Sequence, residues 1–394
     1  MQFSPMLDRL AGLGGAKWGV HFAARERMEA GQDIVDLTIG NPDVPAPKAL
    51  VDATARAMRA GRTQYSNGRG ELTLREALAR RYSASTGRGI GADQVLCVPG
   101  TQTALYTVLV GLAEPGTEVL VGDPMYATYE GVITASGAKV VPVPLRPENG
   151  FRIAARDIAS RITARSRAIL LNTPHNPTGA VLSEDDITAI GELARAHDLW
   201  IICDEVYEEL IFEGVRFASP LARADLADRT VIVSSISKSH AAPGFRSGWC
   251  IGSADFCTKI LPLSETMLFG NQPFIADMTA LAVSAPSEVA AGMRARFAAR
   301  AARLADRLDR DTALRAHRPQ AGMFALIDIR ATGLGDHDYA MSLLGHGVAV
   351  MPGSAFGQKL DGWVRLALTV DDSRFDAACD RIVAHALALE RKRA

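Results

Sequence analysis

Seven short apolar runs, each bounded by turn-forming residues, recur through the middle of the chain and alternate with longer amphipathic stretches. Apolar runs of about four to eight residues with such boundaries are typical of buried strands. The seven runs are Gln94–Val98, Glu118–Gly122, Lys139–Leu145, Ala168–Asn172, Leu199–Asp204, Thr230–Ser235 and Gly248–Gly252. Strands that are apolar along their whole length, with helices between them, predict an α/β fold in which helices cover both faces of a mostly parallel sheet.

Two of the stretches between these runs have a helical pattern, Gln102–Ala113 and Ser183–Asp198. The second begins with Ser183 and has Asp186 three residues later. This spacing is typical of a capping box, in which the two residues satisfy each other's free backbone N–H groups at a helix start. We expect both helices to pack on the sheet.

The C-terminal quarter of the chain has a different pattern. An Ala/Arg-rich helix is predicted from about Ser287 to Leu308, and a final helix from Ser373 onward. Between them, Gly322–Arg330 and Gly347–Met351 are predicted strands. This mixture indicates a separate small α+β domain.

The length of the chain also predicts two domains. At 394 residues it exceeds the roughly 250 to 300 residues at which a single core stops growing. We expect a large domain with a seven-stranded sheet over residues 45–290. The small domain would combine an N-terminal segment, residues 1–44, with residues 291–394, and a ligand site would lie between the two domains.

The charge and the cysteine content indicate which kinds of ligand and binding partner the protein has. Lys and Arg number 43 against 44 Asp and Glu, so no overall field favours nucleic acid or an anionic membrane. The five cysteines are scattered without a C-x-x-C pair, which argues against a disulfide framework and against a metal site. We find neither a signal-peptide pattern nor a run of 18 apolar residues, and we expect a cytoplasmic protein that acts on small molecules.

The segment SSISKSHAAPGFRSG, residues 234–248, brings a serine, a lysine and an arginine together directly after an apolar run. A lysine amine condenses with a carbonyl when burial or neighbouring charge lowers its pKa, which makes Lys238 a candidate nucleophile. Ser235 and Arg246 would anchor a phosphate by charge-assisted hydrogen bonds. Taken alone, this segment would more often be a solvated basic loop, so the prediction of a binding site depends on the other segments.

Two further segments are expected at the same edge of the sheet. Gly100 and Thr101 lie between an apolar run and a helical stretch, where free N–H groups at a helix start bind anions, although a plain strand-to-helix turn is the alternative. Asn176 follows another apolar run, at the edge where open α/β sheets bind ligands. Its neighbour His175 has no evident carboxylate partner in the sequence, and we assign it a packing or turn role.

An acid ends the next apolar run. Asp204 follows LWIIC, and a buried acid needs a cationic partner. A protonated pyridine nitrogen is such a partner, because the carboxylate holds the proton on the ring and the ring then withdraws electrons. Tyr207, three residues later, could hydrogen-bond a phenolic oxygen of that ring. A helix N-cap or a salt bridge is the alternative for Asp204, and a core role is the alternative for Tyr207.

Taken together, these motifs resemble the class I and II aminotransferases of the fold type I pyridoxal-phosphate-dependent family. The resemblance rests first on S-x-S-K followed by G-x-R, on H-N-P-T-G and on D-E-V-Y. It extends over nearly the whole chain, through DLTIGNPD at 36–43, YSNGRGELTLR at 65–75, DPMYATY at 123–129, PGSAFG at 352–357 and VRLAL at 364–368.

The resemblance implies a role for each matching residue, with pyridoxal 5′-phosphate as the cofactor. Lys238 would form a Schiff base with it, and Asp204 would pair with its pyridine nitrogen. Tyr207 and Asn176 would hold its ring oxygen, while Tyr126 would stack on the ring. Lys238, Asp204 and Tyr207 are the residues that the resemblance places in catalysis.

The resemblance also implies how the ends of the ligands are bound. The phosphate would be held by Ser235, Arg246, Thr101, Gln102, and by Tyr65 from a second subunit, which implies a homodimer. Arg365 would bind the α-carboxylate of the substrate as a two-pronged fork, with Asn176 and the backbone of Gly40 beside it.

The implied activity is transfer of the amino group of an L-amino acid to a 2-oxo acid by a ping-pong mechanism. Segments such as DPMYATYE, PHNPTG and GMFALIDIR are most similar to the arginine–pyruvate transaminase branch, with arginine or a neutral amino acid as donor. The alternatives are an aspartate or aromatic aminotransferase and a C–S lyase on the same fold. A dehydrogenase is a further alternative, but the chain has no G-x-G-x-x-G after a strand.

Overall fold

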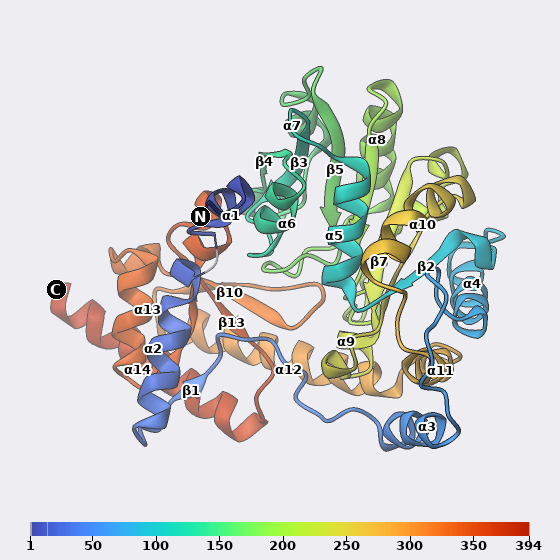
Figure 1. Ribbon diagram of the computed structural model, residues 1–394. Helices are drawn as coiled ribbons and strands as arrows, with labels where there is room; N and C mark the ends of the chain where they lie inside the picture. Colours follow the sequence, from blue (N-terminus) through green and yellow to red (C-terminus); the bar gives the residue numbers. More distant parts are fainter. Residues whose placement is uncertain (1, 14, 394) are drawn as a thin grey trace.

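The computed structural model describes residues 2–13 and 15–393, and a seven-stranded sheet forms its centre (Figure 1). The strands lie in the order β2-β8-β7-β6-β5-β3-β4, and all neighbours are parallel except β8, which is antiparallel to β2 and β7. Their bounds are β2 (Val95–Val98), β3 (Glu118–Asp123), β4 (Lys139–Pro144), β5 (Ser166–Asn172), β6 (Trp200–Asp204), β7 (Thr230–Ser235) and β8 (Gly248–Ile251). The predicted α/β fold and all seven predicted strands are therefore confirmed, with ends shifted by one or two residues.

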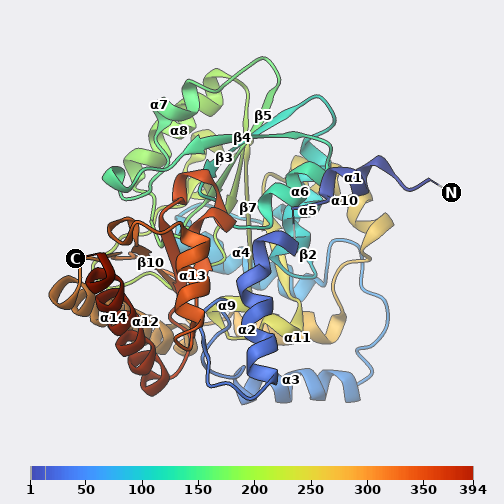
Figure 2. The ribbon, with the colours of Figure 1, turned by 90° about the vertical axis from the view of Figure 1, so that its left-hand side faces the viewer.

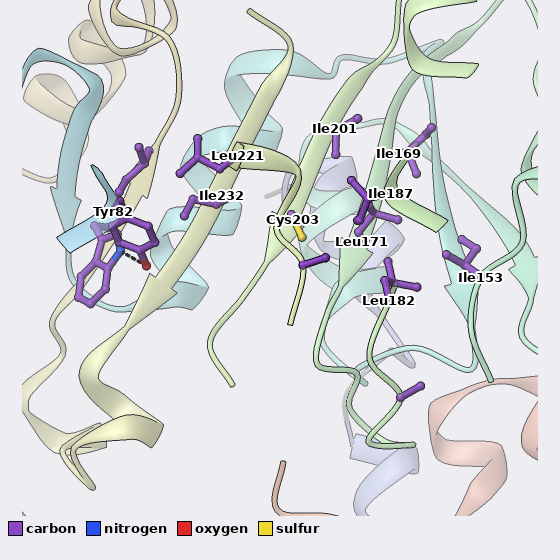
Figure 3. Close-up of a cluster of buried hydrophobic side chains, with 14 of the residues drawn as sticks. Tyr82, Ile153, Ile169, Leu171, Leu182, Ile187, Ile201, Cys203, Leu221 and Ile232 are labelled. Carbon is purple, nitrogen blue, oxygen red and sulfur yellow. Dashed lines mark hydrogen bonds between the residues drawn. The ribbon is translucent and has the colours of Figure 1, made fainter. Parts of the chain in front are cut away.

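Helices cover both faces of this sheet because the strands are apolar on both sides. In β5, for example, Ile169 and Leu171 belong to one buried cluster and Ala168 and Leu170 to another, as the alternation of side chains along a strand requires. The first face is drawn in Figure 3. Helices α4 (Leu72–Thr86), α7 (Ala155–Ala159) and α8 (Glu184–Ala196) cover that face, and α5 (Thr101–Leu112), α6 (Tyr129–Ala135) and α10 (Ala254–Met267) cover the other.

The two helices predicted between strands are α5 and α8, and the capping box of α8 is confirmed. The backbone N–H of Asp186 donates to the Ser183 hydroxyl at 3.1 Å, and the N–H of Ser183 donates to the Asp186 carboxylate at 2.9 Å. Such a cap stabilises a helix by about 1 kcal/mol. In contrast, α5 begins at Gly100 without any side-chain cap, so its first N–H groups stay available.

A third buried cluster joins the N-terminal segment to the C-terminal quarter (Figure 2). The antiparallel sheet β12-β13-β10-β9 lies at its centre, and β1 pairs in parallel with β11. The strands are β1 (Val35–Asp36), β9 (Arg315–His317), β10 (Phe324–Asp328), β11 (Val348–Ala349), β12 (Met351–Pro352) and β13 (Trp363–Ala367). The helices around them are α2 (Gly19–Glu29), α12 (Glu288–Asp311), α13 (Asp336–Leu344) and α14 (Asp372–Arg393).

One predicted element of this region is wrong. The run Gly347–Met351 is not one strand but two, because β11 pairs with β1 and β12 pairs with β13 on either side of Val350. An unbroken apolar run shows that a segment is buried, but it carries no information on which neighbour each residue pairs with. The helices predicted near Ser287 and Ser373 are present as α12 and α14.

The remaining helices connect these parts: α1 (Pro5–Leu10), α3 (Lys48–Arg59), α9 (Ile236–Ser239) and α11 (Pro273–Ala282). All five cysteines are buried free thiols. None of the helices within residues 2–13 and 15–393 combines the length and the apolar character needed to cross a bilayer. The carboxyl ends of β5, β6 and β7 meet at one edge of the large sheet, next to the start of α5. Residues of β10 and β13 line the same cavity as these strand ends.

Candidate active site

A cavity of about 300 Å³ lies at this edge. The strand ends and the start of α5 form its floor, and Trp18, Ile39 and Asn41 of the N-terminal segment form one wall. Every site residue predicted from the sequence lines this cavity except Tyr65: Gly40, Thr101, Gln102, Tyr126, Asn176, Asp204, Tyr207, Ser235, Lys238, Arg246 and Arg365. Segments separated by more than three hundred residues in sequence are thus brought together here.

Lys238 lies on α9, the short helix that follows β7. Its Nζ donates a hydrogen bond to the backbone carbonyl of Gly40 at 3.0 Å. Burial, together with the cations Arg365 and Arg246, lowers the pKa of Lys238 to about 8. A substantial fraction of this amine is therefore neutral, and nucleophilic, near pH 8. Gly40 has to be a glycine because a Cβ there would lie 2.4 Å from the ring of Phe324.

Asp204 is the last residue of β6 and is only 4% exposed. The Tyr129 hydroxyl donates to its Oδ2 at 2.7 Å, and the backbone N–H of Val206 donates to its Oδ1 at 3.1 Å. Burial raises the pKa of Asp204 to about 6, and these two hydrogen bonds and the charge of Lys238 oppose that rise. The carboxyl group is therefore mostly ionised at neutral pH, although it forms no ion pair with any described residue.

Arg365 on β13 is a buried cation, 2% exposed. Its guanidinium is stacked between the rings of Phe324 and Phe356, at 4.0 and 4.3 Å from their centroids. It donates to the Asn176 side-chain oxygen at 3.2 Å and to the Thr38 carbonyl at 2.5 Å, while its Nε has no partner in the described part of the chain.

No carboxylate among residues 2–13 and 15–393 lies within ion-pair distance of Arg365. Burial lowers its pKa to about 10, so it still carries its charge at neutral pH. A buried cation without a counter-charge is costly, and the stacking rings compensate for only part of that cost. This end of the cavity is therefore built to receive an anion.

A second set of donors lines the same cavity. Gly100 has a φ of 88°, and a Cβ there would lie 2.3 Å from Nη2 of Arg246, so only glycine lets the guanidinium approach the start of α5. The hydroxyl of Thr101 is buried and lacks a hydrogen-bond partner within the described residues. Ser235 lies beside them as the N-cap of α9. Free helix N–H groups, two hydroxyls and a guanidinium form a typical anion cradle.

Aromatic and amide side chains also line the cavity. The rings of Tyr126 and Tyr129 meet edge to face at 5.5 Å. Tyr207 is buried beside the Asn176 amide, and burial raises its pKa well above the ordinary value, so it stays a neutral hydrogen-bond donor. Gln102 accepts a hydrogen bond from the Thr128 hydroxyl at 3.1 Å.

Tyr65 lies outside this cavity. Its side chain is 88% exposed and packs against Phe269, at 5.6 Å between ring centroids. His175 also takes no part: its Nδ1 hydrogen-bonds the Thr178 hydroxyl at 2.8 Å, and burial lowers its pKa to about 3. This is the turn role expected for it.

Among the residues of the site that were not predicted from the sequence are Trp18, Tyr129, Phe324 and Phe356. Tyr129, Phe324 and Phe356 lie in segments that carry the family resemblance, so a signal was present without a role attached to it. Trp18 had no such signal, because an isolated aromatic residue is most often part of a core.

Comparison with known proteins agrees with this geometry. Residues 32–382 match the family model described as aminotransferase class I and II. An arginine–pyruvate transaminase (AruH) of Pseudomonas aeruginosa is 43% identical over 97% of both chains, and an aspartate aminotransferase of Bacillus subtilis is 30% identical over 91% of this chain and 93% of its own. Among solved structures, a double mutant of the Thermus thermophilus aspartate aminotransferase superposes with a TM-score of 0.92 at 29% identity, covering 98% of this chain and 100% of that one.

Proposed function

This chain belongs to the class I and II aminotransferases and transfers the amino group of an amino acid to a 2-oxo acid, and we propose that it does so with pyridoxal 5′-phosphate bound in the cavity around Lys238. The observation that supports this most strongly is the shared cavity of Lys238, Asp204 and Arg365. A nucleophilic amine, an ionised acid and an unpaired cation are the three groups that such a reaction needs from the protein.

The residues present fit this cofactor. The charged groups that line the cavity are three cations, Lys238, Arg246 and Arg365, and one acid, Asp204. A ligand set with a phosphate at one end and a carboxylate at the other balances that excess of positive charge. Both sets of donors include an atom without a hydrogen-bond partner in the described chain, the Thr101 hydroxyl in one and the Arg365 Nε in the other.

When bound, the cofactor supplies an aldehyde for the Lys238 amine and a pyridinium ring that withdraws electrons from the α-carbon of the substrate. Arg365 binds the α-carboxylate and so fixes the α-carbon close to Lys238. The amine of Lys238, whose pKa is lowered to about 8, would take the proton from the α-carbon of the substrate and would deliver it to the cofactor carbon on the other side of the transferred nitrogen. Asp204 would hold a proton on the ring nitrogen, and Tyr207 and Asn176 would donate to the ring oxygen.

We further propose that the active unit is a homodimer in which Tyr65 reaches the phosphate of the partner subunit. Exposure of two aromatic side chains that contact each other, Tyr65 and Phe269, supports this, because such a pair is normally covered. Tyr65→Ala would be inactive through loss of cofactor, and Lys238→Ala through loss of the amine. When the two are refolded together, mixed dimers would regain one complete site; no recovery in mixtures that size-exclusion shows to be dimeric would contradict the proposal.

For the donor we propose arginine or a neutral amino acid, with pyruvate as acceptor. The support is the 43% identical arginine–pyruvate transaminase and the lining of the cavity, where no fourth cation among the described residues is left for a second substrate carboxylate. A panel of donors tested against pyruvate and 2-oxoglutarate decides this. Aspartate as the best donor would contradict it, and ammonia release without any oxo acid would indicate a C–S lyase instead.

The division into residues 1–44 with 291–394 and residues 45–290, and a cytoplasmic location, also remain our proposals. The third buried cluster, which joins the chain ends, supports the division, and the five reduced thiols support the location. Limited proteolysis that first cuts near residue 45 or residue 290 would support the boundaries.

The proposed function is tested by Lys238→Ala. We expect kcat to fall by on the order of 10⁴-fold or more, since both the nucleophile and the general base are lost. Lys259→Ala is the matched control, because Lys259 is exposed and its one ion pair within the described residues is with Asp255 on its own helix. Near wild-type turnover by a cofactor-loaded Lys238→Ala protein would overturn the proposal.

A further inference from the structure

The hydroxyl of Tyr129 is the side-chain donor that meets Asp204. The 2.7 Å hydrogen bond joins two residues 75 positions apart in the chain, and both are buried: Tyr129 is 1% exposed. Apart from Tyr129, the only other hydrogen bond to this carboxylate within the described chain comes from the backbone of Val206, which a side-chain substitution does not remove. Tyr129 is thus the one replaceable group that contacts the acid directly.

The position of Tyr129 is itself fixed from several sides. It is the first residue of α6, and its backbone N–H donates to the Tyr126 carbonyl at 3.0 Å. Its ring lies in the buried cluster between the sheet and α5 and meets the Tyr126 ring edge to face at 87°. A side chain held this firmly delivers its hydroxyl to one place, so the carboxylate that accepts it is oriented as well.

We propose that Tyr129 is a positioning residue, which keeps the Asp204 carboxylate ionised and aimed at the ring nitrogen of the bound cofactor. A carboxylate that accepts two hydrogen bonds is a weaker base than one that accepts a single hydrogen bond. The proton that Asp204 shares with the ring therefore stays on the nitrogen, where it makes the ring a better acceptor of electrons. The inference rests on the proposed function, because it assumes that Asp204 faces the cofactor.

The chain offers a matched control for the loss of one buried tyrosine hydroxyl. Tyr339 on α13 is fully buried, and its hydroxyl has no partner within residues 2–13 and 15–393. Tyr339→Phe makes the same chemical change as Tyr129→Phe at equal burial, but far from Asp204. Both phenylalanine variants keep the ring that fills the core, so both are expected to fold.

The test compares cofactor-loaded wild type, Tyr129→Phe, Tyr339→Phe, Asp204→Asn and the double variant Tyr129→Phe/Asp204→Asn. Loss of one hydrogen bond to a charged group is expected to change a rate constant by about tenfold, or the pKa of a coupled group by about one unit. We expect Tyr129→Phe to lower kcat about tenfold with little change in KM. We also expect the pH at which the absorption band of the bound cofactor changes to rise by about one unit, because a less charged ring makes the attached group more basic. Tyr339→Phe should change neither quantity.

The double variant shows whether Tyr129 acts through Asp204. On the Asp204→Asn background, Tyr129→Phe should have no further effect on kcat or on the spectrum. If Asp204→Asn is impaired while Tyr129→Phe matches Tyr339→Phe, the inference is overturned and the proposed function stands. If Asp204→Asn itself keeps full activity, the role of Asp204 in the proposed function fails, and the inference fails with it.

Discussion

Two consecutive acids at the end of β6, Asp204 and Glu205, line different cavities and have opposite electrostatic surroundings. Asp204 faces the candidate active site, where cations outnumber acids. Glu205 lines a cavity of about 660 Å³ between α4 and α8, together with Glu208 and Glu209. Both acids are buried, yet the pKa of Asp204 rises only to about 6, whereas burial and the Glu208 carboxylate raise the pKa of Glu205 well above its usual value.

The difference lies in how the two acids are compensated. A hydroxyl, an amide N–H and a nearby cation keep Asp204 available to a ligand. In the second cavity, Ser219 donates to Glu205 at 2.6 Å, while the other Glu205 oxygen, Oε2, has no hydrogen-bond partner in the described chain. Arg81 pairs there with Glu208 and Glu209. Two buried carboxylates that are neighbours in the sequence thus face different surroundings, and we propose a role in chemistry for Asp204 and a structural role for Glu205.

The largest expected effect that separates the two regions is on turnover. Asp204→Asn removes the negative charge that we propose faces the ring nitrogen, and we expect kcat to fall about 10² to 10³-fold, as for other preorganised electrostatic groups. Glu205→Gln should change kcat by no more than about threefold, since the side chain faces away from the site. Steady-state kinetics on the two purified variants checks this, and equal losses would remove the distinction.

A smaller effect is expected on substrate binding. Arg365→Lys keeps a cation but loses the planar fork, so we expect KM for the amino donor to rise about tenfold to a hundredfold. Arg81→Lys makes the same exchange at the Glu208–Glu209 network and should leave KM unchanged while lowering the melting temperature. An unchanged KM in Arg365→Lys would mean that another group binds the carboxylate.

The pH dependence of stability should follow Glu205. Its pKa is raised in the folded state above the ordinary 4.5, so the stability it contributes is complete below that pH and is lost as the pH rises through the folded pKa. The Glu205→Gln variant has no titrating group at this position, so its melting temperature should fall less than that of the wild type as the pH is raised above 5. If the melting temperatures of the two proteins change with pH in the same way, the pKa of Glu205 is not raised in the folded protein.

The smallest effect is expected from Tyr82→Phe. The Tyr82 hydroxyl donates to Glu208 at 2.8 Å. It also accepts from the Trp249 indole at 3.1 Å, which is the dashed line beside Tyr82 in Figure 3. Its loss should cost about 1 to 2 kcal/mol of stability, with unchanged kcat. Denaturant unfolding measures the first quantity; a fall in kcat without loss of stability would link the network to the active site.

The sequence predicted those features of the fold and of the site that depend on a local residue pattern and on position along a strand. The seven apolar runs predicted the sheet, and the polar residues at their ends, such as Asn176, Asp204 and Ser235, predicted the edge that holds the cavity. Contacts between residues that are distant in the sequence leave no local pattern from which they could be predicted. The Tyr129 hydroxyl on Asp204 and the stacking of Phe356 on Arg365 depend on tertiary packing, and so does the split of Gly347–Met351 into β11 and β12.

The central claim is that the amine of Lys238 binds the cofactor covalently in this cavity. Chemical trapping of that bond in the purified protein tests the claim directly. The cofactor-loaded enzyme would be treated with borohydride, which turns a C=N bond into a stable C–N bond, and digested for mass spectrometry. We predict that the added mass of the reduced cofactor lies on the peptide that contains Lys238 and on no other lysine. Its attachment to a different lysine, or an unmodified Lys238 in a protein that still carries the cofactor, would contradict the account.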